Sequence, residues 1–148
     1  MHASTNLTLF ERLVAQAPDA MIFADRDGTV RVWNSSAQTL FGYSGAEVIG
    51  GSLDVIIPER LRSAHWRGFR TAIETGHAKY MGRVLTTRAV RKNGSKLYVD
   101  LSFALIRDEA GAVTGSLAIA RDCTERYLSD GALRARVSEL EQELKAKS

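Results

Sequence analysis

One histidine stands out among the residues able to do chemistry, because it lies where apolar side chains are expected. Residues 58–75 repeat apolar side chains at helical spacing, and His65 falls on the same stripe as Leu61 and Phe69. A neutral imidazole nitrogen on an apolar face is a good ligand for a metal ion. A single helix histidine also serves as a packed residue that hydrogen-bonds at the edge of a core. The residues around His65 leave both interpretations open.

Few other residues suited to metal binding or catalysis occur in the chain. Cys123 is the only cysteine, which excludes an internal disulfide and a cysteine-rich metal site. The other histidines, His2 and His77, are not spaced to share a ligand set with His65. The sequence has no recognisable Ser/His/Asp or Cys/His set and no phosphate-binding glycine motif. We therefore expect a non-enzymatic protein in which Cys123 is a small, partly buried apolar residue.

The composition is typical of a soluble globular domain with an appendage. The chain has 148 residues, of which 45% are hydrophobic and 25% charged, and its net charge is only +3. No apolar stretch approaches the ~20 residues that span a bilayer, and no signal-peptide pattern opens the sequence. Its basic residues are scattered. We therefore expect a cytoplasmic location, with neither nucleic acid nor membrane as a partner.

The first half of the chain predicts a helix, a hairpin and three further helices. The expected elements are a helix over 7–17, strands over 20–24 and 29–33, and helices over 34–42, 44–50 and 58–75. Asn34 and Ser44 are predicted N-caps, and Ser44 has the spacing of a capping box with Glu47. Pro58 and Gly76 are predicted to bound the long helix that carries His65.

The second half changes to a period of two, which indicates strands. Three long strands are expected over 80–91, 97–107 and 112–122, joined by turns at 93–94 and 108–111. Leu101 and Phe103 lie on the apolar alternation, so we expect them to be buried between sheet and helices. Alternation in the preceding strand would place Met81, Arg83 and Leu85 on one face.

Both ends of the chain carry apolar helical stripes with no partner in the sequence. The C-terminal stripe has coiled-coil spacing but covers less than two heptads, too few for a stable helix on its own. The residues of the two stripes are Leu7, Phe10, Leu13 and Val14, and Leu133, Val137, Leu140 and Leu144. We expect a homodimer joined through one or both stripes, with an effector domain or partner protein beyond the C-terminal helix.

Three segments carry a family resemblance: Val32–Tyr43, Ile56–His65 and Ala120–Arg126. Together they resemble a PAS domain, a small sensory module of bacterial signalling proteins, over residues 20–126. The resemblance implies an α+β fold with a five-stranded antiparallel sheet in the order 2-1-5-4-3 and helices on one face. The expected organisation is an N-terminal amphipathic cap helix over 1–18, the sensory domain over 19–126 and a coiled-coil-like signalling helix over 127–148.

A narrower resemblance bears on the ligand. The segment Leu61–His65 and the later Gly82-Arg83 resemble the haem-binding oxygen-sensor PAS domains of bacterial kinases and cyclic-dinucleotide phosphodiesterases. The resemblance implies that His65 ligates haem iron. The residues expected around the haem are Met81, Arg83, Leu85, Leu101, Phe103, Leu117 and Ile119. Arg83 stands at the family's methionine-like position and Leu85 at its arginine-like position, which leaves the choice among O2, CO and NO open.

Two other functions remain open for a chain of this family. One is a cofactor-free dimerisation or interaction module, and the other is a receptor for a small organic ligand with Arg83 as the counter-charge. Flavin photochemistry is disfavoured, because no cysteine lies in residues 52–57, where the light-sensing subfamily carries its reactive one. Asp122 resembles the acidic residue at the exit of PAS domains, which couples the ligand state to the C-terminal helix.

Overall fold

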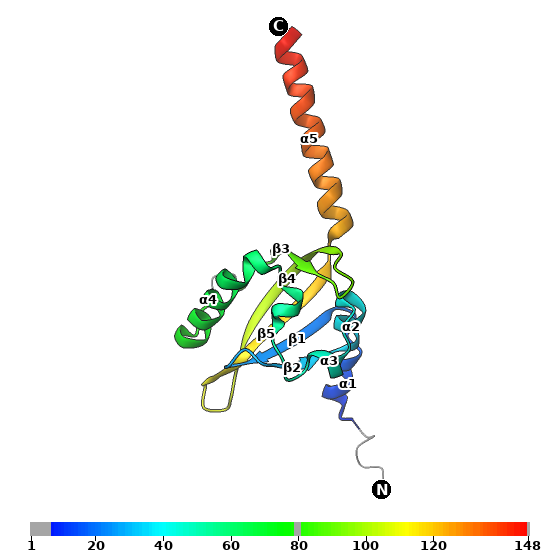
Figure 1. Ribbon diagram of the computed structural model, residues 1–148. Coiled ribbons are helices and arrows are strands. Elements are labelled where there is room, and N and C mark those ends of the chain that lie inside the picture. Colours follow the sequence, from blue (N-terminus) through cyan, green and yellow to red (C-terminus); the bar gives the residue numbers. More distant parts are fainter. Residues whose placement is uncertain (1–6, 79–80, 148) are drawn as a thin grey trace.

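The computed structural model describes residues 7–78 and 81–147, which fold around one antiparallel sheet (Figure 1). The elements are α1 (Leu9–Ala15), β1 (Ala20–Asp25), β2 (Val30–Trp33), α2 (Ser35–Phe41), α3 (Gly45–Val48), the 3-10 helix η2 (Leu53–Ile56), α4 (Glu59–Thr75), β3 (Leu85–Val90), β4 (Lys96–Arg107), β5 (Val113–Asp122) and α5 (Thr124–Lys147). The strands lie in the order β2-β1-β5-β4-β3. Helices α2, α3 and α4 gather on one sheet face, and α5 projects away from the domain. The predicted α+β class and strand order are confirmed.

Asn34 holds the corner between the first hairpin and α2. Its side-chain oxygen accepts hydrogen bonds from the backbone N–H groups of Ala37 and Met21, at 3.0 and 2.9 Å. Its amide nitrogen donates to the carbonyls of Val14 and Asp19. The side chain is buried, and all these bonds satisfy polar groups that would otherwise be unpaired. The predicted N-cap is confirmed, and the same residue also ties the end of α1 to the domain.

Two more of the predicted helix boundaries are confirmed. Ser44 and Glu47 form the reciprocal hydrogen bonds of a capping box at the start of α3. Gly76 ends α4 in the left-handed conformation with a φ of 74°, which glycine adopts without steric cost. The long helix that carries His65 therefore has the length that the sequence predicts.

The strand register separates an inner face, toward the helices, from an outer face. Residues opposite each other in antiparallel strands share a face. Phe103 lies opposite Ala118, which lies opposite the buried Ile22, so all three are on the inner face. Ser102 and Ile119 are the strand neighbours of Phe103 and Ala118 and lie opposite each other, so both are on the outer face.

The core is concentrated under one half of the inner face. Its largest fully buried side chains come from β2, α2 and β4: Val30, Phe41, Leu97 and Val99. Trp33 packs beside Phe41, with ring centroids 5.5 Å apart, and its indole N–H donates to the carbonyl of Tyr43. We call this region the packed half. Under α4 the inner-face side chains are only half-buried, and we call that region the open half.

The third strand is shorter than predicted. It was expected from residue 80, which lies outside the described residues, but β3 begins at Leu85. Met81 and Arg83 lie in the turn segment that precedes it. Gly82 has a φ of 79°, which is incompatible with an extended strand. The predicted alternation of Met81, Arg83 and Leu85 on one strand face is therefore wrong before Leu85.

Helix α5 begins at Thr124, so residues 127–147 of the predicted signalling unit lie within it, and it has no buried residue. Leu133 and Leu144 of the predicted stripe are 65% and 69% exposed. No helix in residues 7–78 or 81–147 is long and apolar enough to cross a bilayer.

Candidate functional site

His65 lies on the side of α4 that faces the domain. It shares this side with buried Ala72 and Ile73 and half-buried Phe69, at spacings of three or four residues. Its ring meets Trp66 edge-on, with centroids 4.6 Å apart, and lies 6.4 Å from the ring of Phe69. The predicted position of His65 on the core-facing stripe is confirmed.

The imidazole of His65 lacks the hydrogen bonds that buried polar groups usually make. Its Nδ1 atom is buried and has no partner among the described residues. Burial lowers the pKa of His65 below its ordinary value of 6.5, and the Asp54 carboxylate opposes this shift only in part. The ring is therefore neutral at pH 7 and keeps a nitrogen lone pair. A buried polar atom without a partner needs an explanation, and a bound ligand would provide one.

Apolar side chains of β3 and β4 extend the inner sheet face beyond the core. Leu85 of β3 is paired with Leu101 of β4, and Phe103 lies two residues further along the same face. All three are half-buried, so Leu101 and Phe103 are less buried than predicted, although Leu101 packs against the core. The physical reason is that α4 approaches the sheet mainly at β5 and does not close over β4.

Two predicted ligand contacts lie on the opposite side of the sheet. Leu117 is opposite Phe23, and Ile119 is opposite Met21, on the outer face. Their neighbours Ala118 and Ala120 occupy the inner face instead. A side chain on the outer face cannot line a pocket under α4, because successive residues of a strand point to opposite faces. The assignment of Leu117 and Ile119 to the pocket is therefore corrected.

The residues predicted on the distal side are exposed. Met81 is 40% exposed, and Arg83 lies in the same exposed segment before β3. The structure thus places His65 on the domain-facing side of α4 and Leu85, Leu101 and Phe103 on the inner face of the sheet, whereas Met81 and Arg83 lie in the exposed segment before β3. His77 is exposed, as predicted.

Trp66 makes contacts that the sequence did not reveal. Its indole N–H donates to a carboxylate oxygen of Asp54 in η2, at 2.6 Å. Its ring also packs so closely over the β1–β2 turn that a Cβ added to Gly28 would come within 2.6 Å of it. The Asp27-Gly28 turn was predicted, but no local pattern indicates that α4 would pack on it. These two contacts hold α4 beside the turn one residue away from His65.

A second group of interacting side chains joins the outer face of β4 to the first turn of α5. The Asp100 carboxylate accepts two hydrogen bonds from the Arg126 guanidinium, at 2.7 and 3.0 Å, and one from the Thr86 hydroxyl at 2.6 Å. Arg126 and Thr86 together hold the pKa of Asp100 at about 2. Beside this pair Tyr98 and Tyr127 stack, with centroids 4.0 Å apart and planes inclined by 14°. We call these contacts the α5 junction.

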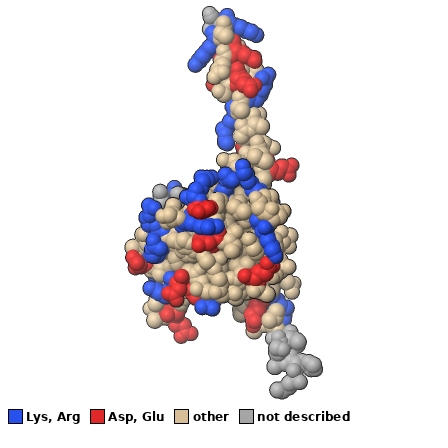
Figure 2. Space-filling view, in the orientation of Figure 1, with Lys and Arg blue, Asp and Glu red and all other residues tan. Residues whose placement is uncertain are grey.

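Asp122 and Thr124 complete the α5 junction at the end of β5. Asp122 accepts a hydrogen bond from the Thr124 backbone N–H at 2.8 Å and forms an ion pair with Arg91 at 3.2 Å. The Thr124 hydroxyl oxygen accepts from the backbone N–H of Tyr98 at 3.0 Å. Cys123 between them is buried, and burial raises the pKa of its thiol. Figure 2 shows basic side chains around the base of α5 with acidic ones between them.

Comparison with known proteins gives two relatives among bacterial sensors. The sensor protein FixL of Bradyrhizobium diazoefficiens is 30% identical over 143 residues, which are 95% of this chain and 26% of FixL. The oxygen sensor protein DosP of Escherichia coli is 33% identical over 103 residues, which are 70% of this chain and 13% of DosP. The chain therefore spans about a quarter of the first relative and about an eighth of the second.

Solved structures and a family profile agree on the fold. The structure of an RNA-binding light-oxygen-voltage receptor superposes with a TM-score of 0.70 at 25% identity, over 91% of this chain and 38% of that one. A PAS domain from Colwellia psychrerythraea superposes with a TM-score of 0.66 at 23% identity, over 78% of this chain and 95% of that one. The profile of the PAS fold matches residues 8–123. The chain therefore belongs to the PAS family of sensory domains.

Proposed function

We propose that this PAS domain is a non-enzymatic, haem-based gas sensor in which His65 ligates the iron and α5 carries the signal. The observation that supports this most is the buried Nδ1 of His65, which has no hydrogen-bond partner in residues 7–78 and 81–147. A neutral imidazole with an unused lone pair is the form of histidine that binds iron. The similarity to DosP, an oxygen sensor, supports the same function.

The side chains under α4 suit a haem group better than a bare metal ion. No three His, Cys, Asp or Glu side chains of the described chain are grouped to hold an ion. Haem iron needs only an axial protein ligand, because the porphyrin supplies the others. His65 would hold the iron, and Leu85, Leu101 and Phe103 would contact the apolar ring. When bound, haem supplies an iron atom that can bind a diatomic gas.

The remaining residues of the proposed site act by charge and by exclusion of water. Arg83, in the segment before β3, would face either a propionate or the bound gas, and Met81 beside it would cover the ring edge. Trp66, fixed by Asp54, would hold the α4 backbone next to His65 in place. The open half of the inner face is the space that the ring would fill.

Absorption spectra of protein purified with haem supplied test this proposal. We expect a sharp Soret band for the wild type and its loss or severe weakening in His65→Ala, because the axial donor is removed. Arg83→Ala should retain haem but change the off-rate of the gas, since its role is electrostatic. His77→Ala is the matched control, because His77 is exposed and outside the proposed site. A Soret band that is unchanged in His65→Ala would contradict the assignment.

A second candidate function is a cofactor-free dimerisation module. Its support is the exposure of apolar side chains on both terminal helices, with Phe10 of α1 76% exposed and Leu133 and Leu144 of α5 similarly open. Three units over 1–18, 19–126 and 127–148 are proposed on the same basis, with the terminal helices joining two copies. Light scattering of the full chain should then give a dimer, and residues 18–126 alone a monomer. A monomeric full chain at micromolar concentration would contradict this.

The α5 junction is the route that we propose for the output. Tyr98 and Asp100 belong to β4, the strand whose inner face carries Leu101 and Phe103, and their partners Arg126 and Tyr127 lie in the first turn of α5. A shift of β4 caused by a ligand on its inner face would therefore act directly on the base of the helix. An effector or partner protein beyond α5 would receive it.

A further inference from the structure

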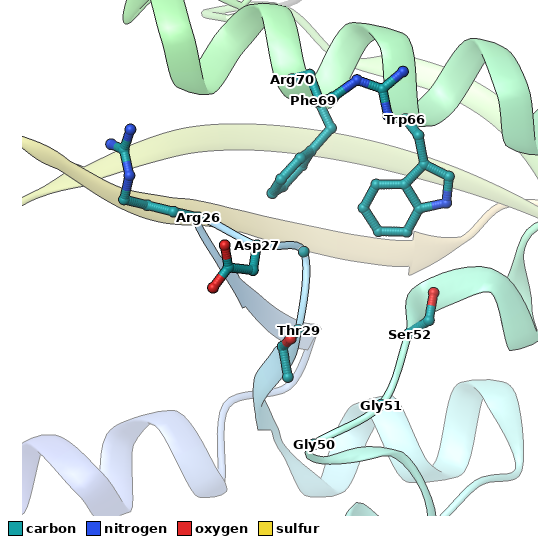
Figure 3. Close-up of a pocket in the computed structure, with 10 residues that line it drawn as sticks. Arg26, Asp27, Thr29, Gly50, Gly51, Ser52, Trp66, Phe69 and Arg70 are labelled. Atoms are coloured by element: carbon teal, nitrogen blue, oxygen red, sulfur yellow. The ribbon is translucent and has the colours of Figure 1, made fainter.

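A cleft of about 650 Å³ opens between α4 and the β1–β2 turn (Figure 3). Its volume lies within the range of small-molecule sites. Three segments that are distant in the sequence form it: the turn, the loop 50–52 before η2, and the middle of α4. Its lining residues are Arg26, Asp27, Gly28, Thr29, Gly50, Gly51, Ser52, Trp66, Phe69 and Arg70. None of the residues proposed to contact haem is among them.

One wall of the cleft is aromatic. Trp66 and Phe69 point from α4 toward the turn, and their rings meet edge-on with centroids 5.3 Å apart. The hydrogen bond to Asp54 fixes the plane of the Trp66 indole, so this wall is pre-formed. A flat aromatic ligand can stack on such a surface or meet it edge-on.

The opposite wall is formed mainly by the backbone of Gly28, Gly50 and Gly51, which have no side chains to cover it. Gly50 donates from its N–H to the carbonyl of Val30, and Gly51 accepts from the N–H of Val30, so the loop is fixed to β2. Gly28 has a φ of 83° and no room for a side chain, because Trp66 packs over it. Both walls are therefore held in place by contacts that do not depend on a ligand.

The charges around the cleft favour an anion. Arg70 forms no hydrogen bond or ion pair with any described residue, so its guanidinium is available to a ligand. Arg26 keeps one nitrogen on the carbonyl of Val113 at 2.6 Å. Asp27 is the one acidic side chain in the lining, and it extends to the other side of the turn from Trp66 (Figure 3). Two guanidinium groups and one carboxylate leave a net positive charge.

We propose that this cleft is a second ligand site, for a small aromatic carboxylate. The ring would pack against Trp66 and Phe69. The Arg70 side chain, which lies along α4 in Figure 3, would turn toward the cleft so that its guanidinium donates hydrogen bonds to the planar carboxylate. The hydroxyl groups of Thr29 and Ser52 lie at the polar rim. The site shares no lining residue with the proposed haem site, but it reaches α4 one residue away from His65. A ligand there would bear on the position of the proposed iron ligand.

Benzoate is the probe, observed by nitrogen–proton NMR of the full chain, with benzyl alcohol as the uncharged match. We expect benzoate to shift the amide signals of Gly28, Gly50 and Gly51 and the Trp66 indole N–H along one saturable curve. Benzyl alcohol should produce weaker binding. Arg70→Gln should weaken benzoate binding about three- to tenfold, because a charge-assisted hydrogen bond is lost at an exposed position. Asp27→Asn should strengthen it about twofold by removing a repulsive charge.

Arg67→Gln is the matched control, since it removes the same charge from an exposed position of α4 outside the cleft. It should leave benzoate binding unchanged. His65→Ala, which removes the proposed haem ligand, should still give saturable shifts at the glycines, which separates this site from the proposed haem site. Equal effects of Arg67→Gln and Arg70→Gln would overturn the proposal. Equal binding of benzoate and benzyl alcohol, or the absence of saturable shifts at the glycines, would overturn it as well.

Discussion

The two ends of β4 present side chains on the same inner face of the sheet, but these side chains are buried to very different extents. At the start of the strand, Leu97 and Val99 are fully buried in the packed half, in the same core cluster as Phe41 of α2 and Val48 of α3. From Leu101 onward the inner-face side chains are only half-buried, and Phe103 lies in the open half under α4. The alternation of apolar residues is the same at both ends. The distance between the covering helices and the sheet, and not the sequence of the strand, therefore decides which end of β4 is buried.

Because of this difference in burial, one end of β4 contributes to the stability of the fold and the other end can respond to a ligand. The packed half also carries, on its outer face, Tyr98 and Asp100, which hold the base of α5. The open half carries the side chains proposed to contact haem. A ligand can therefore change the open half while the core that fixes the fold stays closed. The output helix is attached on the packed side, at Asp100, which directly precedes Leu101 at the start of the open half.

The largest expected effect tests the packing difference itself. Phe41→Ala should lower the free energy of unfolding by about 3–5 kcal/mol, because Phe41 is fully buried and its removal leaves a cavity. Phe103→Ala should cost only about 1–2 kcal/mol in the haem-free protein, because that side chain is half-buried. Urea unfolding of both variants gives the two values. Equal losses would show that α4 packs onto β4 in solution.

An intermediate effect is expected at the α5 junction. Asp100→Asn should weaken the contact with Arg126 and cost about 1 kcal/mol, since the pair is bidentate but partly exposed. Amide hydrogen exchange of the first turn of α5 should accelerate, while the packed half remains protected. Ser102→Ala, two residues further along the same outer face, is the control and should change neither. Accelerated exchange throughout the sheet would show that the junction is part of the core.

The smallest effect concerns the neutral histidine of the open half. Because the folded-state pKa of His65 is lowered, the unfolded chain binds more protons below pH 6.5, so stability is complete above that pH and falls as the pH decreases. The loss at pH 6 should be under about 1 kcal/mol. His65→Gln should remove this part of the pH dependence, and His77→Gln should not. Thermal unfolding between pH 6 and 8 makes the comparison, and a slope that survives in His65→Gln would contradict it.

The sequence predicted the elements well where the signal is local. Asn34, Ser44 and Gly76 each act within a few residues of their own position, and each marks its helix boundary as expected. The strand at Leu85 was predicted too early, because the alternation around Gly82 looks extended while its backbone is not. The period-two alternation alone does not reveal the left-handed conformation of Gly82.

The candidate site was predicted in part for a related reason. Periodicity placed His65 on the inward stripe of α4, but it could not give the distance of α4 from the sheet, on which the burial of Phe103 depends. Leu117 was assigned to the wrong face because face depends on register between strands, and register is a tertiary property. The contact of Arg126 with Asp100 joins residues 26 apart, beyond the reach of any local pattern.

The length of α5 turns the α5 junction into a pivot. The helix has 24 residues and leaves the domain without burying any of them, so it extends about 36 Å at 1.5 Å per residue (Figure 1). A rigid rod of that length multiplies a small rotation at its base, and a tilt of about 5° moves the far end by about 3 Å. A movement at the base can be too small to disturb the packing of β4. At Leu144 the same movement would become a displacement of about an atomic diameter. The length of α5 therefore amplifies a small rotation at the α5 junction into a larger displacement at the C-terminal end of the helix.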